Sequence, residues 1–422
     1  MNTSKLTSTL LGVMTAGTGY SLLRNANQLN PAETALGTHS QGRPMYDELI
    51  KALHEKTNYT LSAVKRPASG CLHHDYLVPG GPYEEQWDWD AFFMATALIH
   101  ENPHDAVYMK NWALNYLENA ANNGHVPGCI TPAGADPRLN QMKPLLAQGC
   151  LKAVDTLNDT QWLKPHWSTL QAVVDYRYEN LWNHDYQLPV WFDSMESGAD
   201  NNVAVMDYPD KSVLSTDVAA FSALEYRSLA QLAQHMGDEA TQRRAQDISD
   251  TVISNVEKHL WHEEDGMYYN KCAVTGEWIK RVSYSTFMLF WANIADERRA
   301  KSAIEHFLLN DDHMRCEFGF RTLSKQDEMY NNVNMIKPHS NWQGPVWPLA
   351  NYLYMIGLLN YGYRDAAIDL AVKSSHLVIN DIDRTGGMHE NYDAETGLPL
   401  AAPNFISWNI LVRGMLTKAL EQ

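Results

Sequence analysis

Residues 216–236 read TDVAAFSALEYRSLAQLAQHM, and residues 237–260 continue with GDEATQRRAQDISDTVISNVEKHL. In the second segment apolar side chains recur every three or four positions, at Ala245, Ile248, Val252, Val256 and Leu260. This period matches one face of an α-helix. Gly237 stands between the segments, where a helix is expected to end. The stretch therefore predicts two successive helices joined by a short turn.

Similar helix patterns fill most of the remaining sequence, and each ends at a Gly, a Pro or a cluster of Asn and Asp. Further helices are expected over residues 46–56, 90–100, 104–121, 167–181, 285–294, 297–309, 346–359, 364–377 and 405–420. Strand patterns are nearly absent, except that Asp265-Gly266 predicts a hairpin turn leading into a small ribbon. The pattern is typical of an all-α domain. Helices that arrive in pairs indicate a helical toroid whose end loops line a cavity.

The length of 422 residues exceeds that of a common single domain, but rings of repeated helices reach this size as one unit. We expect one large domain over residues 44–422, preceded by an extended arm over residues 1–43. Residues 6–23 are uncharged but too polar to span a bilayer. We expect a cytoplasmic protein, or a periplasmic or secreted one if residues 1–30 form a signal peptide.

The charge balance excludes several classes of partner. Fifty acidic and 33 basic residues give a net charge of −17, which repels phosphate backbones and anionic membrane surfaces. We therefore expect neither nucleic acid nor a membrane as partner. The five cysteines lie far apart without CxxC spacing, which argues against a zinc knuckle or a disulfide framework and favours a reducing compartment. The sequence sets no expectation for the oligomeric state.

Residues 191–202, WFDSMESGADNN, concentrate acidic side chains around a Ser-Gly pair. Asp193, Glu196 and Asp200 lie within eight positions, beside two aromatic residues. Carboxylates so close repel one another, which separates their pKa values and suits them to acid/base catalysis. The alternative is an acidic loop whose charges face water.

Residues 81–93, GPYEEQWDWDAFF, alternate aromatic rings with hydrogen-bond acceptors just ahead of a helix. Flat apolar rings beside carboxylates suit a sugar, whose faces carry C–H groups and whose rim carries hydroxyls. The candidate sugar-binding residues are Tyr83, Gln86, Trp87, Asp88, Trp89 and Asp90. The alternative is that Asp88 or Asp90 caps the helix while the tryptophans pack.

Two more motifs follow in the second half of the chain. Residues 341–347, NWQGPVW, set Trp342, Gln343 and Trp347 on a Gly-Pro turn, and residues 386–397, GGMHENYDAETG, contain Glu390. Asp200 and Glu390 are distant in sequence but can face each other across a ring. One could then protonate a leaving oxygen while the other takes a proton from attacking water.

Phosphoryl and metal chemistry find little support. The chain has no Walker or Rossmann glycine loop. His73 and His74 are adjacent, so on regular structure they point apart and cannot share a metal. Residues 381–386 imitate the start of a calcium loop, but Tyr392 stands where the closing Glu belongs, so a turn is predicted. We expect no metal and no cofactor.

In sequence order, QWDWDAFF, ESGADNN, NWQGPVW and HENYDAETG resemble the mannosylglycerate and glucosylglycerate hydrolase branch of glycoside hydrolase family 63. That branch is related to the α,α-trehalases of family 37. The resemblance covers about residues 44–420. It implies an (α/α)6 barrel and the inverting hydrolysis of a terminal α-glycoside, with a small carbohydrate as substrate.

The resemblance also implies roles for individual residues. Asp200 would be the general acid and Glu390 the general base. The sugar pocket would be lined by Tyr83, Trp87, Asp88, Trp89, Asp90, Trp342, Gln343 and Trp347. Two positions depart from the family pattern: relatives tend to have Gln or Lys before Pro-Pro where this chain reads QMKPL from Gln141, and Gln343 replaces a common Arg. The identity of the substrate therefore stays open.

The expected function is that of an inverting exo-α-glycosidase acting on a small α-glucoside or α-mannoside such as a glycosylglycerate. A trehalase, or a family 63 α-glucosidase acting on a short α-gluco-oligosaccharide, is the alternative within hydrolases. A sugar epimerase or isomerase on the same toroid would use His-based proton transfer, with His339 and His389 as candidates. A carbohydrate-binding protein would need the tryptophans but no matched acids.

Overall fold

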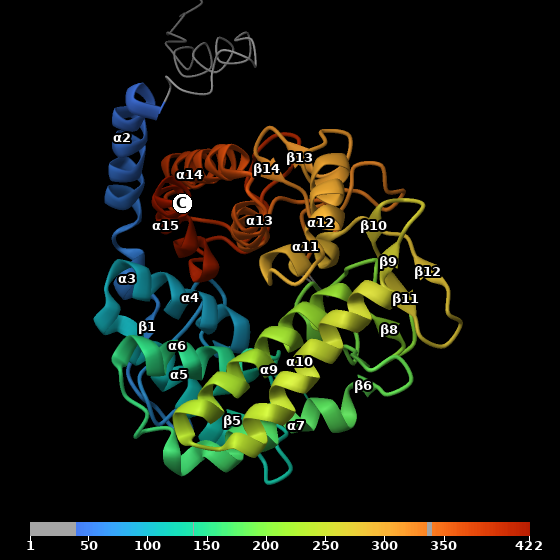
Figure 1. Ribbon diagram of the computed structural model, residues 1–422. Helices are drawn as coiled ribbons and strands as arrows, with labels where there is room; N and C mark the ends of the chain where they lie inside the picture. Colours follow the sequence, from blue (N-terminus) through green and yellow to red (C-terminus); the bar gives the residue numbers. More distant parts are fainter. Residues whose placement is uncertain (1–38, 138, 336–339) are drawn as a thin grey trace, which may run out of the picture. The chain divides into compact units, whose positions relative to one another are not determined.

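The structure is a computed structural model that describes residues 39–137, 139–335 and 340–422 (Figure 1). By its internal contacts the chain divides into two units, residues 1–48 and residues 49–422. The second unit carries all the candidate site residues. The candidate signal segment, residues 1–30, and His339 lie outside the described residues.

One set of helices in the second unit forms a closed series of contacts. Its members are α4 (Asp88–Glu101), α5 (Ala106–Asn119), α6 (Leu146–Leu157), α9 (Thr216–Met236), α11 (Tyr284–Trp291), α13 (Pro348–Asn360) and η4 (Ser407–Leu411), which continues into α15 (Val412–Glu421). α4 packs on α5, α5 on α6, α6 on α9, α9 on α11, α11 on α13, α13 on η4, and η4 again on α4. The series returns to its starting helix, so the expected ring is closed.

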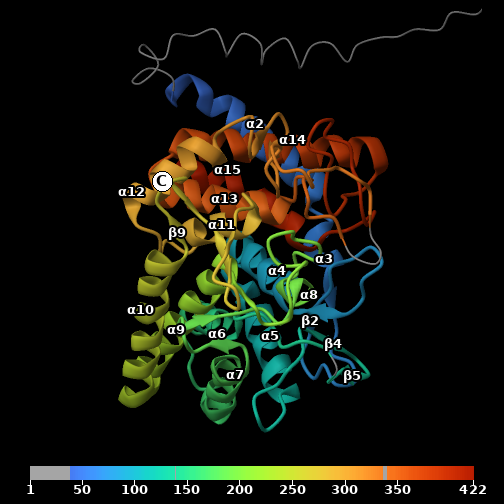
Figure 2. The same ribbon diagram turned by 90° about the vertical axis from the view of Figure 1, so that its right-hand side faces the viewer.

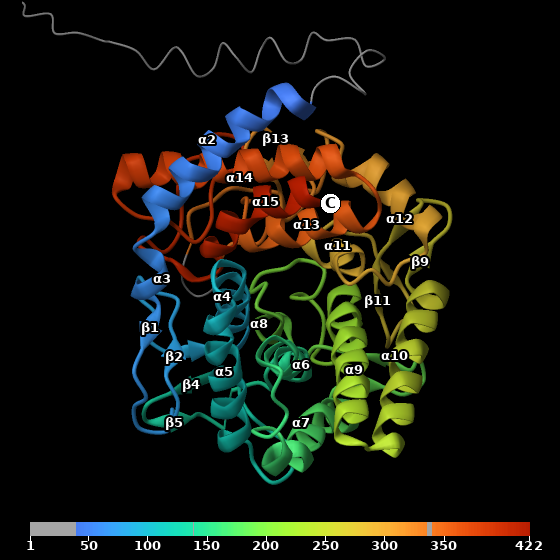
Figure 3. The same cartoon turned by 60° about the vertical axis from the view of Figure 1, so that its left-hand side comes forward.

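Other long helices pair with members of this ring. They are α7 (Trp167–Asn180), α10 (Glu239–His259) and α14 (Arg364–Thr385). The short helix α12 (Glu297–Ala303) instead contacts the π-type turn η3 (Ile304–Leu308) and residues 267–268. α7 packs on α6 and α9, α10 on α9, and α14 on α13 and α15. Figures 1 and 3 show α10 alongside α9. The first helix of the described chain is α2 (His39–Thr57). The short helices are α3 (Thr60–Ala63), η1 (Pro103–Asp105), η2 (Lys164–His166) and α8 (Ser194–Ser197).

The pair α9 and α10 follows its sequence closely. Gly237 ends α9 with a φ of 72°, in the left-handed region that glycine enters without strain. The carboxylate of Asp238 then accepts the backbone N–H of Thr241 at 3.1 Å and so caps α10. Val252 and Val256 are among the buried residues of α10, whose apolar face meets α9. The predicted helix pair is confirmed.

The strands are two or three residues long and form separate small sheets. β9 (Trp261–His262) pairs with β10 (Met267–Tyr268) around Asp265-Gly266, and β11 (Asn270–Cys272) lies between β12 (Trp278–Ile279) and β8 (Val213–Leu214). The predicted ribbon is confirmed. The remaining strands are β1 (Lys65–Arg66), β2 (Tyr76–Leu77), β3 (Gln86–Trp87), β4 (Cys129–Thr131), β5 (Gly134–Ala135), β6 (Trp182–Asn183), β7 (Leu188–Pro189), β13 (Arg315–Cys316) and β14 (Gly319–Phe320).

Two local predictions are wrong. His39–Arg43, expected in the extended arm, belong to helix α2. The turn expected over residues 381–386 is instead the last turn of α14, which ends at Gly386 with a φ of 85°. The helix continues this far because Asp381 is buried and its carboxylate accepts hydrogen bonds from Thr385, Tyr392 and His389. These partners occupy the oxygens that a calcium loop would direct at the ion.

Candidate active site

The predicted motifs from the middle and the end of the chain meet through hydrogen bonds. The side-chain oxygen of Asn201, in ESGADNN, accepts the backbone N–H of Trp342 at 2.6 Å. The amide of Gln343 donates to the backbone carbonyl of Asn201 at 3.0 Å. Val346 and Tyr392 exchange backbone hydrogen bonds at 2.8 and 2.9 Å, which attaches the tryptophan turn to the segment that carries Glu390.

The ESGADNN segment also lies against the start of α4. Figures 2 and 3 show α8 beside α4. Gly198 follows α8 with a φ of 80°, and a Cβ at this position would lie 2.6 Å from the Trp89 ring and 2.8 Å from the Lys143 side chain. Only glycine therefore fits between α8 and these two side chains. The four motifs thus gather at one place.

Asp200 and Glu390 are joined by a single serine. The backbone N–H of Ser340 donates to Asp200 Oδ2 at 3.0 Å, and the Ser340 hydroxyl donates to Glu390 Oε2 at 3.2 Å. Because one residue makes both contacts, the two bonded carboxylate oxygens lie at most about 10 Å apart. Ser340 and Glu390 are both buried. No sequence pattern indicated Ser340, because an isolated serine before a tryptophan turn has many structural uses.

Asp90 completes a carboxylate cluster with Asp200 and Glu390. Burial, followed by the charges of Asp200 and Asp90, raises the pKa of Glu390 to about 8. Burial raises the pKa of Asp90 to about 7, although Ser407 donates a hydrogen bond to it at 2.6 Å. Burial and then the charges of all three carboxylates raise the pKa of the Tyr83 hydroxyl, so Tyr83 also faces the cluster.

Several aromatic rings near the cluster contact one another. Trp342 stacks on Trp347 with ring centroids 4.0 Å apart, and Trp89 lies 5.8 Å from Trp342 and 5.4 Å from Trp408. Phe405 contacts Trp408 at 4.8 Å and Tyr83 at 5.9 Å. The candidates Trp89, Trp342 and Trp347 thus form one group. The sequence does not single out Phe405 and Trp408 as site residues, because their segment has the pattern of a packing helix.

The three carboxylates of WFDSMESGADNN have different partners. Asp193 caps α8 by accepting the backbone N–H of Glu196 at 2.8 Å, and it also accepts the Asn140 side chain at 3.0 Å. Glu196 is buried in an ion pair with Arg177. Asp200 alone of the three bonds to Ser340. The acid/base hypothesis for this stretch therefore narrows to Asp200.

Asp88 and Gln86, two predicted sugar-binding residues, bond to protein groups. Asp88 is buried, and its carboxylate accepts the backbone N–H of Lys143 at 2.7 Å, the Lys143 ammonium at 3.2 Å and the backbone N–H of Trp89 at 2.7 Å. Gln86 is buried and accepts a hydrogen bond from Asn115 of α5 at 3.3 Å. Asp88 is the first residue of α4, which has no side-chain cap, so its carboxylate joins the start of the helix to Lys143 and does not act as the expected cap.

Lys143 belongs to the segment where the chain departs from the family pattern. Its ammonium lies 4.8 Å from the centre of the Trp89 ring as well as beside Asp88. Gln141, two residues earlier, instead accepts the backbone N–H of Val126 at 2.9 Å and donates to the Gly124 carbonyl at 3.3 Å. Lys143 therefore lies against the aromatic group that contains Trp89, whereas Gln141 bonds to the backbone of residues 124–126.

Gln343 and Trp87 occupy contrasting environments. Gln343 is buried and, besides donating to Asn201, accepts the side-chain amide of Asn331 at 3.0 Å, so it ties three loop segments together. Trp87 precedes α4 in β3 and is only partly buried. Among the described residues, the buried indole N–H groups of Trp87, Trp342 and Trp408 have no hydrogen-bond acceptor.

The histidine of the epimerase alternative is held by a buried acid. His389 Nδ1 lies 3.0 Å from Asp381 Oδ2, and the His389 backbone carbonyl accepts the Asn409 side chain at 2.7 Å. This arrangement braces the backbone next to Glu390. His339, the other candidate of that alternative, is outside the described residues.

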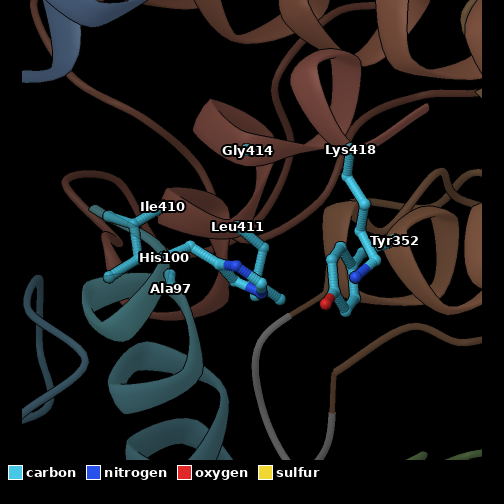
Figure 4. Close-up of a pocket in the computed structure, with 7 residues that line it drawn as sticks. All are labelled: Ala97, His100, Tyr352, Ile410, Leu411, Gly414 and Lys418. Carbon is cyan, nitrogen blue, oxygen red and sulfur yellow. The ribbon is translucent and has the colours of Figure 1, made fainter. Parts of the chain in front are cut away.

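A separate small pocket lies at the other end of α4 (Figure 4). Its lining includes His100, Tyr352 and Lys418, and no member of the carboxylate cluster. Within the ranges that the structure covers, no three His, Cys, Asp or Glu side chains are grouped as metal ligands. No helix in those ranges is long and apolar enough to cross a membrane.

A mannosylglycerate hydrolase from Thermus thermophilus, solved in complex with glucose, has the same fold. Its structure superposes with a TM-score of 0.68 at 18% sequence identity, over 86% of this chain and 99% of that chain. The helical ring is accordingly an (α/α)6 toroid.

Two curated relatives also match this chain in sequence. A mannosyl-oligosaccharide glucosidase from Saccharomyces cerevisiae is 24% identical over 231 residues, which are 49% of this chain and 27% of the glucosidase. A periplasmic trehalase from Escherichia coli O1:K1 / APEC is 22% identical over 424 residues, covering 88% of this chain and 72% of the trehalase. The chain thus spans about a quarter of the glucosidase's length.

Family profiles match the region that carries the site. A trehalase profile matches residues 27–130. The profile of the mannosylglycerate hydrolase MGH1-like glycoside hydrolase domain matches residues 83–408, which runs from Tyr83 to Trp408 and includes the whole carboxylate cluster. As the four motifs predicted, the chain belongs to this family of glycoside hydrolase domains.

Proposed function

We propose that this protein is an inverting exo-α-glycosidase that hydrolyses a small α-glucoside or α-mannoside, with residues 44–422 as its catalytic domain. The observation that carries the proposal is the pair Asp200 and Glu390, bridged by Ser340 inside a wall of tryptophans. Inverting glycosidases keep their carboxyl groups about 6.5–9.5 Å apart to admit a water molecule, and the bridge allows that separation. The names of the relatives, a mannosylglycerate hydrolase, a trehalase and a glucosidase, support the class.

In the proposed reaction, Asp200 gives its proton to the leaving oxygen as the bond from that oxygen to the anomeric carbon breaks. Glu390 takes a proton from a water molecule whose oxygen bonds to the same carbon from the opposite face. The single displacement inverts the anomeric configuration. Asp90 and Tyr83 would bond sugar hydroxyls, and the tryptophan rings would pack on the C–H faces of the sugar. Burial of the site strengthens these electrostatic contacts.

The pH dependence of kcat/KM should show a basic limb near pH 8. The reaction needs one proton on the pair Asp200 and Glu390, and burial with neighbouring charges raises the pKa of Glu390 to about 8. Above that pH the pair loses its last proton, so kcat/KM should fall about tenfold per pH unit. Initial rates measured from about pH 4 to about pH 10 test this expectation. An undiminished rate to the upper end would contradict it.

Hydrolysis should release the sugar with inverted configuration. From an α-linked substrate, proton NMR recorded within the first minutes should show the β-anomer in excess, before mutarotation equilibrates the product. Fresh α-anomer would mean retention, which requires a covalent intermediate and would overturn the assignment of Glu390 as base.

The substrate itself is best identified by a panel of α-glycosides. Glucosylglycerate, mannosylglycerate, trehalose, kojibiose and nigerose differ in the sugar and in the leaving group, and release of monosaccharide can be measured for each. A clear preference for trehalose would favour the trehalase alternative. If no member of a wider α-glycoside panel is hydrolysed, the proposed function falls.

We propose a cytoplasmic location, because the five cysteines are free thiols, a state suited to a reducing compartment. The alternative is a periplasmic or secreted protein if residues 1–30 form a signal peptide.

A further inference from the structure

Ser340 makes two hydrogen bonds of different chemical kinds to the two carboxylates. Its backbone N–H, which bonds to Asp200, is a permanent donor that every side chain at this position would keep. Its hydroxyl, which bonds to Glu390, belongs to the serine side chain and can rotate. Replacing the side chain therefore changes the contact to Glu390 and preserves the contact to Asp200.

We propose that Ser340 is a positioning residue whose hydroxyl shifts the shared proton from Glu390 toward Asp200. This inference rests on the proposed function. A buried carboxylate pair that holds one proton has two arrangements, and hydrolysis needs the one with Asp200 protonated and Glu390 ionised. The Ser340 hydroxyl stabilises that arrangement, because a hydroxyl that donates to a carboxylate favours the ionised form.

The acidic groups that face Glu390 act in the opposite direction. Asp200, from the segment after α8, and Asp90, from α4, are both acidic and disfavour a negative charge on Glu390. Tyr83, from the loop before α4, faces the same carboxylates. His389, on the same segment as Glu390, is engaged with Asp381. In contrast to the two acidic groups, the hydroxyl of Ser340 lowers the pKa of Glu390.

The test compares Ser340→Ala with Ser340→Thr, which keeps a hydroxyl. In Ser340→Ala, kcat should fall about tenfold or more, and the basic limb of the kcat/KM profile should move up by about one pH unit. Ser340→Thr should stay near wild type in both. Ser222→Ala serves as a control, because Ser222 is a buried serine of α9 whose hydroxyl has no hydrogen-bond partner within the described chain. An unshifted limb in Ser340→Ala, or equal shifts in the Ala and Thr variants, would refute the proposal.

A second measurement separates this inference from the proposed function. Infrared difference spectra recorded against pH follow the protonated carboxyl of Glu390 directly, with Glu390→Gln to identify its band, and need no substrate. In Ser340→Ala the band should persist to higher pH than in the wild type. An unchanged titration refutes the role of Ser340 even if the enzyme hydrolyses α-glycosides. A shifted titration in a protein that hydrolyses no glycoside would instead refute the function alone.

Discussion

Asp200→Asn should lower kcat on a glycoside with a poor leaving group by a factor of about a thousand or more. The amide cannot supply the proton that the leaving oxygen needs. Its oxygen can still accept the backbone N–H of Ser340, so the fold should be kept. Steady-state kinetics, together with a thermal unfolding curve for each variant, measure both expectations.

Two comparisons sharpen this experiment. Asp193→Asn changes a carboxylate of the same motif that caps α8 and accepts a hydrogen bond from Asn140. Asn is an equally good cap, so kcat should stay near wild type. An α-glycosyl fluoride needs little acid assistance, so it should restore turnover to Asp200→Asn but not to Glu390→Gln. Normal turnover of ordinary glycosides by Asp200→Asn would remove Asp200 from the mechanism.

Arg177→Met should cost about 3–5 kcal/mol in the free energy of unfolding. Arg177 is buried, pairs with Glu196, donates to the carbonyls of Val190 at 3.1 Å and Met142 at 3.2 Å, and stacks on Trp191 at 5.1 Å. Removing the guanidinium leaves the carboxylate of Glu196 buried without its counter-charge. Urea unfolding of the variant and the wild type measures the difference.

The double variant Arg177→Met with Glu196→Gln isolates the cause. It removes the unpaired charge as well as the arginine, so it should recover much of the loss. If the double variant were as unstable as the single one, the cost would come from the lost packing and carbonyl contacts instead. Because this ion pair holds the segment that leads to Asp200, kcat should fall in parallel with stability.

The helices could be predicted from sequence because their causes are local. The period of apolar residues in α10, and the glycine at position 237 that ends α9, act within a few residues. The end of α14 could not be predicted in this way. Asp381 reads as a turn residue, and it is helical because His389 and Tyr392, later in the chain, bond to its carboxylate.

The candidate site was only partly predictable for the same reason. The sequence presents Asp193, Glu196 and Asp200 as equals, and their distant partners separate a cap, an ion pair and a member of the carboxylate cluster. Periodicity cannot tell that Gln86 meets α5. Trp408 lies in an apolar run that predicts a helix, so its place among the site's aromatic rings depends on how the ring closes.

The closure of the ring has a consequence for the order of events during synthesis. Asp90 bonds to Ser407, which lies 317 residues later, and Glu101 bonds to Arg413 across a similar interval. Contacts of such sequence separation carry a large loop-closure entropy and form late. A nascent chain that has emerged from the ribosome only as far as α14 has neither Glu390 nor the η4 segment. We expect newly made chains to remain catalytically silent until η4 and α15 dock.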